Sequence, residues 1–277
     1  MQTYPISEVE KASMHRSRAR LVAHLLALVL FCGAPVVHAQ IADMEDGINK
    51  AGRQRMLSQR IAKAYLQIGQ KADEARSRKV FDASIALFDR QLVELKNFAP
   101  TPEIRGTYQR LEKSWLAYKD LLVGTRPSPE NGRRVLALAD EVLVLAHEGT
   151  GQLEKLAGTQ RGRLVNVAGR QRMLSQRMAA QYQAIAWGIA PATMGGDLGK
   201  ARQEFTRALG DLTSASSALP HIRDELRLAE QQWLFFENAL DQADGGKLMR
   251  SVNVATTSER ILEVMEQVTA HFERLPN

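Results

Sequence analysis

An internal repeat constrains the fold of this chain more than any other feature. The ten residues Ala51–Arg60, AGRQRMLSQR, recur letter for letter as Ala168–Arg177, 117 positions later. Matches continue beyond this block, and they include the pairs Asn49 and Asn166, Tyr65 and Tyr182, Phe88 and Phe205, and, after one inserted residue, Trp115 and Trp233. Self-similarity of this kind indicates copies of one structural unit. We therefore interpret residues 40–157 and 158–277 as a tandem duplication.

Both units are expected to be helical throughout. Apolar residues recur at spacings of three and four, and prolines or glycines mark the breaks. The predicted helices span 42–71, 74–97, 102–124 and 130–157, then 160–189, 197–217, 221–243 and 247–274. Four helices joined by short connections predict an antiparallel four-helix bundle in each unit, so the fold class is all-α. The sequence leaves open whether Gly158 and Thr159 separate two helices or lie within one long helix.

The first 39 residues are expected to be a signal peptide. A basic run at 15–20 directly precedes an apolar run at 21–31, and small residues stand at −3 and −1 of a cut after Ala39. The sequence leaves open whether translation begins at the first methionine or at Met14. No later run reaches the ~20 apolar residues that span a bilayer. We therefore expect a soluble, exported, periplasmic chain.

Composition excludes several kinds of site. Hydrophobic residues make up 44% of the 277 and charged residues 25%, as in an ordinary globular protein. The single cysteine, Cys32, excludes an intrachain disulfide or a cysteine-based metal site, and the bulky Phe31 before it disfavours lipid attachment. Lys and Arg number 37 against 31 Asp and Glu, an excess too small and too dispersed to indicate a nucleic-acid partner.

Catalytic and metal motifs are not expected either. His147, His221 and His271 are scattered without metal-ligand spacing, which favours core or surface roles for them. The sequence has neither a Walker loop nor a nucleophile elbow, so we expect no enzyme and no cofactor. Trp115 and Trp233 are expected to pack in the cores of the two units.

The duplicated block has an unusual helical face. One stripe of its helix is apolar and should face the core of its own unit: Leu57, Ile61, Ala64 and Ile68. The opposite side carries small residues around one arginine, in both copies: Ala51, Ser58 and Ala62 around Arg55, and Ala168, Ser175 and Ala179 around Arg172. Small residues allow two helices to approach closely, and Gly52 and Gly169 leave the backbone accessible nearby. This face is therefore expected to meet another helix.

If the two faces meet, within the chain or across a homodimer, Arg55 and Arg172 come together. Two unneutralised guanidinium groups repel by about 4 kcal/mol at ~4 Å and an effective dielectric near 20. A small anion between them would convert this repulsion into attraction, and the planar guanidinium suits a planar oxyanion such as nitrate or nitrite. The alternative is that helix arginines are solvated or pair with carboxylates, which we expect for Arg53 and Arg60. A recent duplication could also leave identical residues without a shared chemical role.

At these residues the chain resembles a known sensor family. The stretches Ile48–Ile61 and Val165–Met178 resemble the PilJ-type domain of type IV pili methyl-accepting chemotaxis transducers and, more distantly, the periplasmic domain of nitrate/nitrite sensor kinases. In the nitrate-sensing relatives, the arginine before the methionine clamps nitrate at a dimer seam, with a glycine nearby. The resemblance therefore implies ligand-binding roles for Arg55, Arg172, Gly52 and Gly169. Together with small residues of the same helical face, the expected ligand-binding set also includes Ala51, Ala168, Ser58 and Ser175.

The resemblance also implies a function. We expect an exported periplasmic protein that binds a small oxyanion, with nitrate or nitrite favoured, and reports it to a membrane-bound sensor or chemotaxis protein. The membrane helices and cytoplasmic modules of the relatives do not fit within this chain, so we expect it to bind but not itself to signal across a membrane. The alternative is a helical interaction protein without a ligand, associated with a pilus, chemotaxis or sensor-kinase system.

Overall fold

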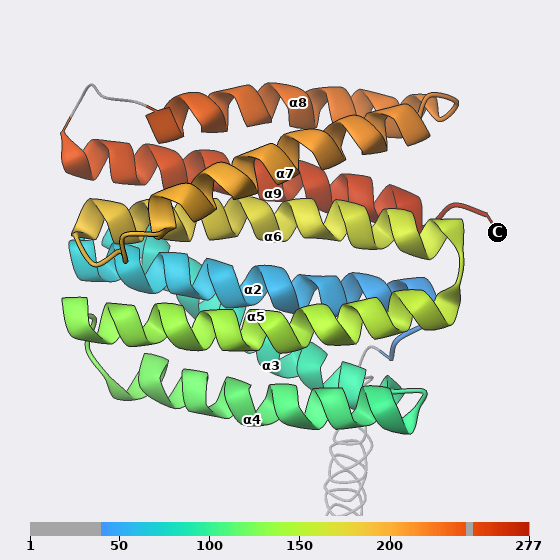
Figure 1. The fold of residues 1–277 in the computed structure, drawn as a ribbon, viewed down its shortest axis with the longest axis horizontal. Coiled ribbons are helices and arrows are strands. Elements are labelled where there is room, and N and C mark those ends of the chain that lie inside the picture. The colour runs from blue at the N-terminus through green and yellow to red at the C-terminus, as the bar shows by residue number, and fades with distance from the viewer. Residues whose placement is uncertain (1–39, 242–245, 277) are drawn as a thin grey trace, which may run out of the picture. The chain divides into compact units, whose positions relative to one another are not determined.

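The computed structural model describes residues 40–241 and 246–276, and every element within them is an α-helix (Figure 1). The helices are α2 (Met44–Gln70), α3 (Glu74–Phe98), α4 (Pro102–Gly124), α5 (Pro129–Ala157), α6 (Gln160–Trp187), α7 (Met194–Ala215), α8 (Pro220–Asp241) and α9 (Lys247–Glu273). The predicted all-α fold is confirmed, and the predicted helix ends differ by three residues at most where they can be compared. The predicted signal peptide, its cut after Ala39 and Cys32 lie outside the described residues.

Local capping explains where several helices begin and settles the junction between the two units. The side chain of Asp43 accepts a hydrogen bond from the amide of Asp46 at 2.8 Å and caps α2. At the junction, Gly158 has φ 62°, a left-handed conformation that ends α5. Thr159 then accepts a bond from the amide of Gly162 at 2.9 Å and caps α6. The helices are therefore separate.

The two halves pack in the same way. In the first, α2 lies against α3 and α5, and α4 lies against α5; in the second, α6 lies against α7 and α9, and α8 lies against α9. The halves meet through α2 and α6, which lie side by side in Figure 1. These two helices are parallel, because Lys63 contacts Gln176 and Gln70, further along α2, contacts Gln183. This seam joins residues 40–277 into one compact unit.

The core follows the predicted apolar pattern. The stripe Leu57, Ile61, Ala64 and Ile68 is buried. Trp115 stacks on Phe88 with ring centroids 3.9 Å apart, and Trp233 stacks on Phe205 at 4.2 Å, so the packing role predicted for both tryptophans is confirmed. In the part of the chain that the structure describes, no helix is both long and apolar enough to span a bilayer.

Candidate functional site: the seam between α2 and α6

The seam brings the two copies of the block together within one chain. Arg55 and Arg172 are both 0% exposed. A Cβ atom built on Gly52 would lie 3.1 Å from Nη2 of Arg55 and 3.7 Å from Nη2 of Arg172, and one built on Gly169 would lie 3.6 and 3.0 Å from the same atoms. Both guanidinium groups therefore converge on the two glycines. The site is complete without a second copy of the chain.

The remaining predicted site residues are buried but have no free polar group directed to a ligand. Ala51 and Ala168 are at most 1% exposed. Ser58 donates its hydroxyl to the backbone oxygen of Arg55, and Ser175 donates its hydroxyl to that of Arg172, both at 2.9 Å. These small residues allow close packing, and both serine hydroxyls are used within their own helices.

Two asparagines cross the seam and bind the arginines. Nη2 of Arg55 donates to Oδ1 of Asn166 at 2.6 Å, and Nη2 of Arg172 donates to Oδ1 of Asn49 at 2.7 Å. Each asparagine also donates to a carboxylate on the last helix of the other half: Asn166 to Glu154, and Asn49 to Glu273. We did not predict these site residues, although the asparagines match at the repeat offset just outside the ten-residue block.

The symmetry breaks at one position on α5 and α9. Gln59 donates to the backbone oxygen of Ala139 on α5, and its counterpart Gln176 donates to that of Ser258 on α9. Ala139 and Ser258 are therefore equivalent positions of α5 and α9. Eight residues further along each helix stand His147 and Glu266. The two positions are therefore equivalent but carry different chemistry.

Because these two positions differ, Arg172 and Arg55 have different partners. Nη1 of Arg172 donates to Glu266 at 2.6 Å, and Arg53 donates to the same carboxylate at 2.8 Å. Nη1 of Arg55 instead contacts Nδ1 of His147 at 3.2 Å, and no carboxylate of the described residues forms an ion pair with it. The protein therefore neutralises Arg172 with the Glu266 carboxylate, whereas Arg55 forms no ion pair with a carboxylate of the described residues.

Charge and burial act differently on the two sides. Burial, together with the charges of Arg170 and Arg172, lowers the pKa of Arg55 to about 9. Burial also lowers the pKa of Arg172, but Glu266 opposes that effect. Burial opposes ionisation of Glu266 as well, yet its arginine partners lower its pKa to about 2. Arg55 is thus the seam cation whose charge is least compensated.

Several buried donors of the seam helices have no hydrogen-bond partner among the described residues. They include Nε of Arg55 and Nε of Arg172. The side-chain amides of Gln54 and Gln171, also in the duplicated block, are fully buried and lack partners as well. A buried polar group without a partner costs roughly 1–3 kcal/mol, so a polar ligand that bonded to either Nε would remove such a cost.

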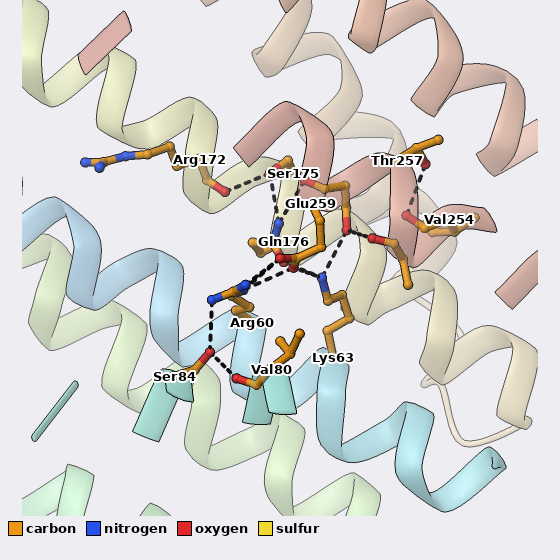
Figure 2. A network of polar contacts seen from close by, with 12 residues as sticks. Arg60, Lys63, Val80, Ser84, Arg172, Ser175, Gln176, Val254, Thr257 and Glu259 are labelled. Carbon is orange, nitrogen blue, oxygen red and sulfur yellow. Dashed lines mark hydrogen bonds and ion pairs between the residues drawn. The ribbon is translucent and has the colours of Figure 1, made fainter. Parts of the chain in front are cut away.

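A second cluster of charges lies further along the seam (Figure 2). Glu259 of α9 receives bonds from Lys63 at 2.5 Å and from Arg60 at 2.5 Å, and Lys63 also donates to Gln176 at 2.6 Å. Burial opposes the charge on Glu259, but its two cations lower its pKa to about 2. Arg53 and Arg60 were expected to be solvated or to pair with carboxylates; the structure shows the second alternative, and both pairs join α2 to α9 of the other half.

Other features lie apart from this seam. A cavity of about 840 Å³ is lined by the end of α2, by parts of α3 and α4 and by the connection after α4, including Tyr65, Phe81 and Arg126, but by none of the predicted site residues. Across the described ranges, no three His, Cys, Asp or Glu side chains are grouped so that they could bind a metal ion. His221 on α8 is exposed at the surface, as is His147, which contacts Arg55 of the seam.

Comparison with known proteins gives one match. A family model described as "PilJ: Type IV pili methyl-accepting chemotaxis transducer N-term" matches residues 38–142 and 159–244. Each segment contains one copy of the ten-residue block. No curated protein and no solved structure matches the chain.

Proposed function

We propose, because this chain belongs to the PilJ family, that it binds a small oxyanion, with nitrate or nitrite favoured, in the seam between α2 and α6. The family is a sensory, chemotaxis-transducer type and not a catalytic one. The observation that carries the proposal is the convergence of two buried arginines on Gly52 and Gly169, where Arg55 forms no ion pair with a described carboxylate.

The energetics favour an anion over an empty seam. A buried charge without a counter-charge is costly, and removing one partner of a buried pair typically costs about 3–5 kcal/mol. An oxyanion would supply that counter-charge through charge-assisted hydrogen bonds, which are roughly twice as strong as neutral ones. The forked, planar donors of arginine match a planar trigonal oxyanion better than a spherical halide.

We also propose that the protein works in the periplasm and reports to a membrane-bound sensor or chemotaxis protein. The basic and apolar runs before Ala39 support export. The family description, a chemotaxis transducer, supports a signalling partner.

Isothermal titration of the purified protein with sodium nitrate, nitrite, sulfate and chloride at constant ionic strength tests the anion site. We expect saturable binding of nitrate or nitrite, weakened at least about tenfold by Arg55→Gln, since this change removes a charge-assisted bond. Arg133→Gln is the matched control, because Arg133 is an exposed arginine on α5. Saturable binding that Arg55→Gln retains would contradict this site.

A second candidate is a helical interaction protein associated with a pilus, chemotaxis or sensor-kinase system. Leu116 on α4 and Leu234 on α8 stand at equivalent positions of the repeat and are 53% and 60% exposed, with Phe235 at 55% beside the latter. Large exposed apolar side chains are typical of contact surfaces when they form a patch. No binding heat with any of the four anions would favour this candidate.

A further inference from the structure

We infer that the seam binds one external anion per chain, on the Arg55 side, and that this anion displaces the His147 ring from Nη1 of Arg55. The inference rests on the proposed function and adds to it the place, the stoichiometry and a specificity-determining residue. It starts from the unequal pair His147 and Glu266, which occupy equivalent positions on α5 and α9.

On the Arg172 side of the seam, a carboxylate of the protein itself, that of Glu266, is the anion that binds the guanidinium. The Glu266 carboxylate receives Nη1 of Arg172 at 2.6 Å and both Nε and Nη2 of Arg53, at 3.1 and 2.8 Å. Three donors from two arginines leave this carboxylate little freedom to move away. An external anion would have to displace a charged, multiply bonded group there, so this side is closed.

On the Arg55 side the equivalent position offers only an imidazole. His147 is exposed at the surface, and its Nδ1 contacts Nη1 of the fully buried Arg55 at 3.2 Å. Burial and the charges of Arg55 and Arg170 lower the pKa of His147, which favours the neutral ring. An oxyanion accepts a stronger bond from a guanidinium than a neutral ring does. Of the two side chains that contact this guanidinium, His147 is exposed and Asn166 is half-buried, so an anion would reach Arg55 by displacing the His147 ring.

Arg170 shows the same asymmetry independently. It is the repeat counterpart of Arg53, which pairs with Glu266 across the seam. Since position 147 offers no carboxylate, Arg170 pairs instead with Glu204 on α7 of its own half. Arg55 and Arg170 both contribute positive potential at His147, and Glu204 offsets part of it.

The built-in counter-ion also indicates the ligand class. Glu266 presents a planar carboxylate to Arg172, so the ligand of Arg55 should be a small planar monoanion of similar size. Nitrate and nitrite belong to this class, and so do formate and acetate. We expect formate to compete with nitrate, whereas the tetrahedral sulfate should compete poorly.

The inference is tested by introducing a carboxylate at position 147, the equivalent of Glu266. His147→Glu should place an internal counter-ion on Arg55 and weaken nitrate binding at least about tenfold, as measured by isothermal titration. Val144→Glu is the matched control, since it adds the same charge to an exposed position one turn away on α5 and should leave binding unchanged. Wild type should bind one nitrate per chain, and circular dichroism checks that each variant is folded.

A second variant keeps the inference falsifiable if His147→Glu does not fold. His147→Ala removes the imidazole without supplying a counter-ion, so nitrate should bind about two- to tenfold more tightly, the equivalent of one ordinary hydrogen bond. Nitrate binding that Arg55→Gln abolishes but that both His147 variants leave unchanged would overturn the inference alone. No anion binding by wild type would overturn the proposed function and the inference with it.

Discussion

Asn49 on α2 accepts a hydrogen bond from Arg172 on α6 at 2.7 Å, and the repeat reproduces the bond in reverse between Asn166 and Arg55 at 2.6 Å. These two crossed bonds connect the halves through the residues that converge on the proposed anion site. Packing of the halves and the position of the guanidinium groups are therefore coupled. Through this coupling, an anion bound at the proposed site would change how α2 and α6 pack.

Replacing either asparagine should destabilise the fold. Asn49→Ala or Asn166→Ala leaves a buried Nη2 without its side-chain acceptor, which costs about 1–3 kcal/mol. Urea unfolding measures the change in the free energy of unfolding. Lys113→Ala, at an exposed position of α4, should change it by less than about 0.5 kcal/mol. The crossed bonds would have no structural role if both asparagine variants matched that control.

Acid should weaken the contacts between α2 and α9. The pKa values of Glu259 and Glu266 are about 2 in the folded protein, below their ordinary value of 4.5. Their stabilising contribution is therefore complete above about pH 4.5 and is lost as the pH falls towards 2. We expect the urea midpoint to fall across this window.

Glu259→Gln should reduce this acid dependence. At pH 7 the variant leaves Lys63 buried without its carboxylate, which costs about 3–5 kcal/mol, and near pH 2 it should approach the wild type in stability. Glu263→Gln, at an exposed position of α9, is the control. Parallel stability curves for Glu259→Gln and the wild type between pH 2 and 7 would refute this assignment.

Two helical glycines should respond oppositely to alanine. A Cβ on Gly69 would lie 2.2 Å from Cη2 of Trp187, so Gly69→Ala should cost about 1–3 kcal/mol through overpacking. A Cβ on Gly151, within α5, would meet no atom within 4 Å, so Gly151→Ala should stabilise by up to about 1 kcal/mol. Thermal unfolding measures the melting temperature of both variants. If both melting temperatures shifted in the same direction, the contact with Trp187 would not decide the effect of Gly69→Ala.

Much of this structure could be predicted from the sequence because the repeat and the helical periodicity are local signals. The helix bounds, the buried Trp115 and Trp233 and the small-residue face around Arg55 all follow from spacing along one helix. The same spacing directs Arg53 away from that face, where a solvated or carboxylate-paired side chain was expected, and Arg53 pairs with Glu266. These predictions required no knowledge of how the two halves meet.

The contacts of the site that could not be predicted from the sequence depend on the register between helices that lie far apart along the chain. Pairing of Arg55 with Asn166, rather than with a residue of its own half, requires the parallel packing of α2 and α6. The equivalence of His147 and Glu266 is hidden because the residues differ, and because a second inserted residue before α9 raises the offset between the halves from 118 to 119. The asymmetry of the site was therefore visible only in three dimensions.

Anion affinity should rise as the pH falls. Arg55 on α2, Arg170 on α6 and Glu204 on α7 are the charged groups that act on His147, and with burial the two arginines lower its pKa. A bound anion offsets that positive potential and raises the pKa again, so the protonated ring binds the anion more tightly. Protonation also removes the lone pair with which Nδ1 accepts from Arg55, so the ring leaves Arg55 more readily when the anion binds. Nitrate affinity should therefore increase below about pH 6.5, by at most about tenfold per pH unit.

Titration in two buffers with different ionisation heats should detect proton uptake, and His147→Gln should abolish both effects. Tighter nitrate binding at higher pH, or an unchanged pH profile in His147→Gln, would exclude His147 as the titrating group.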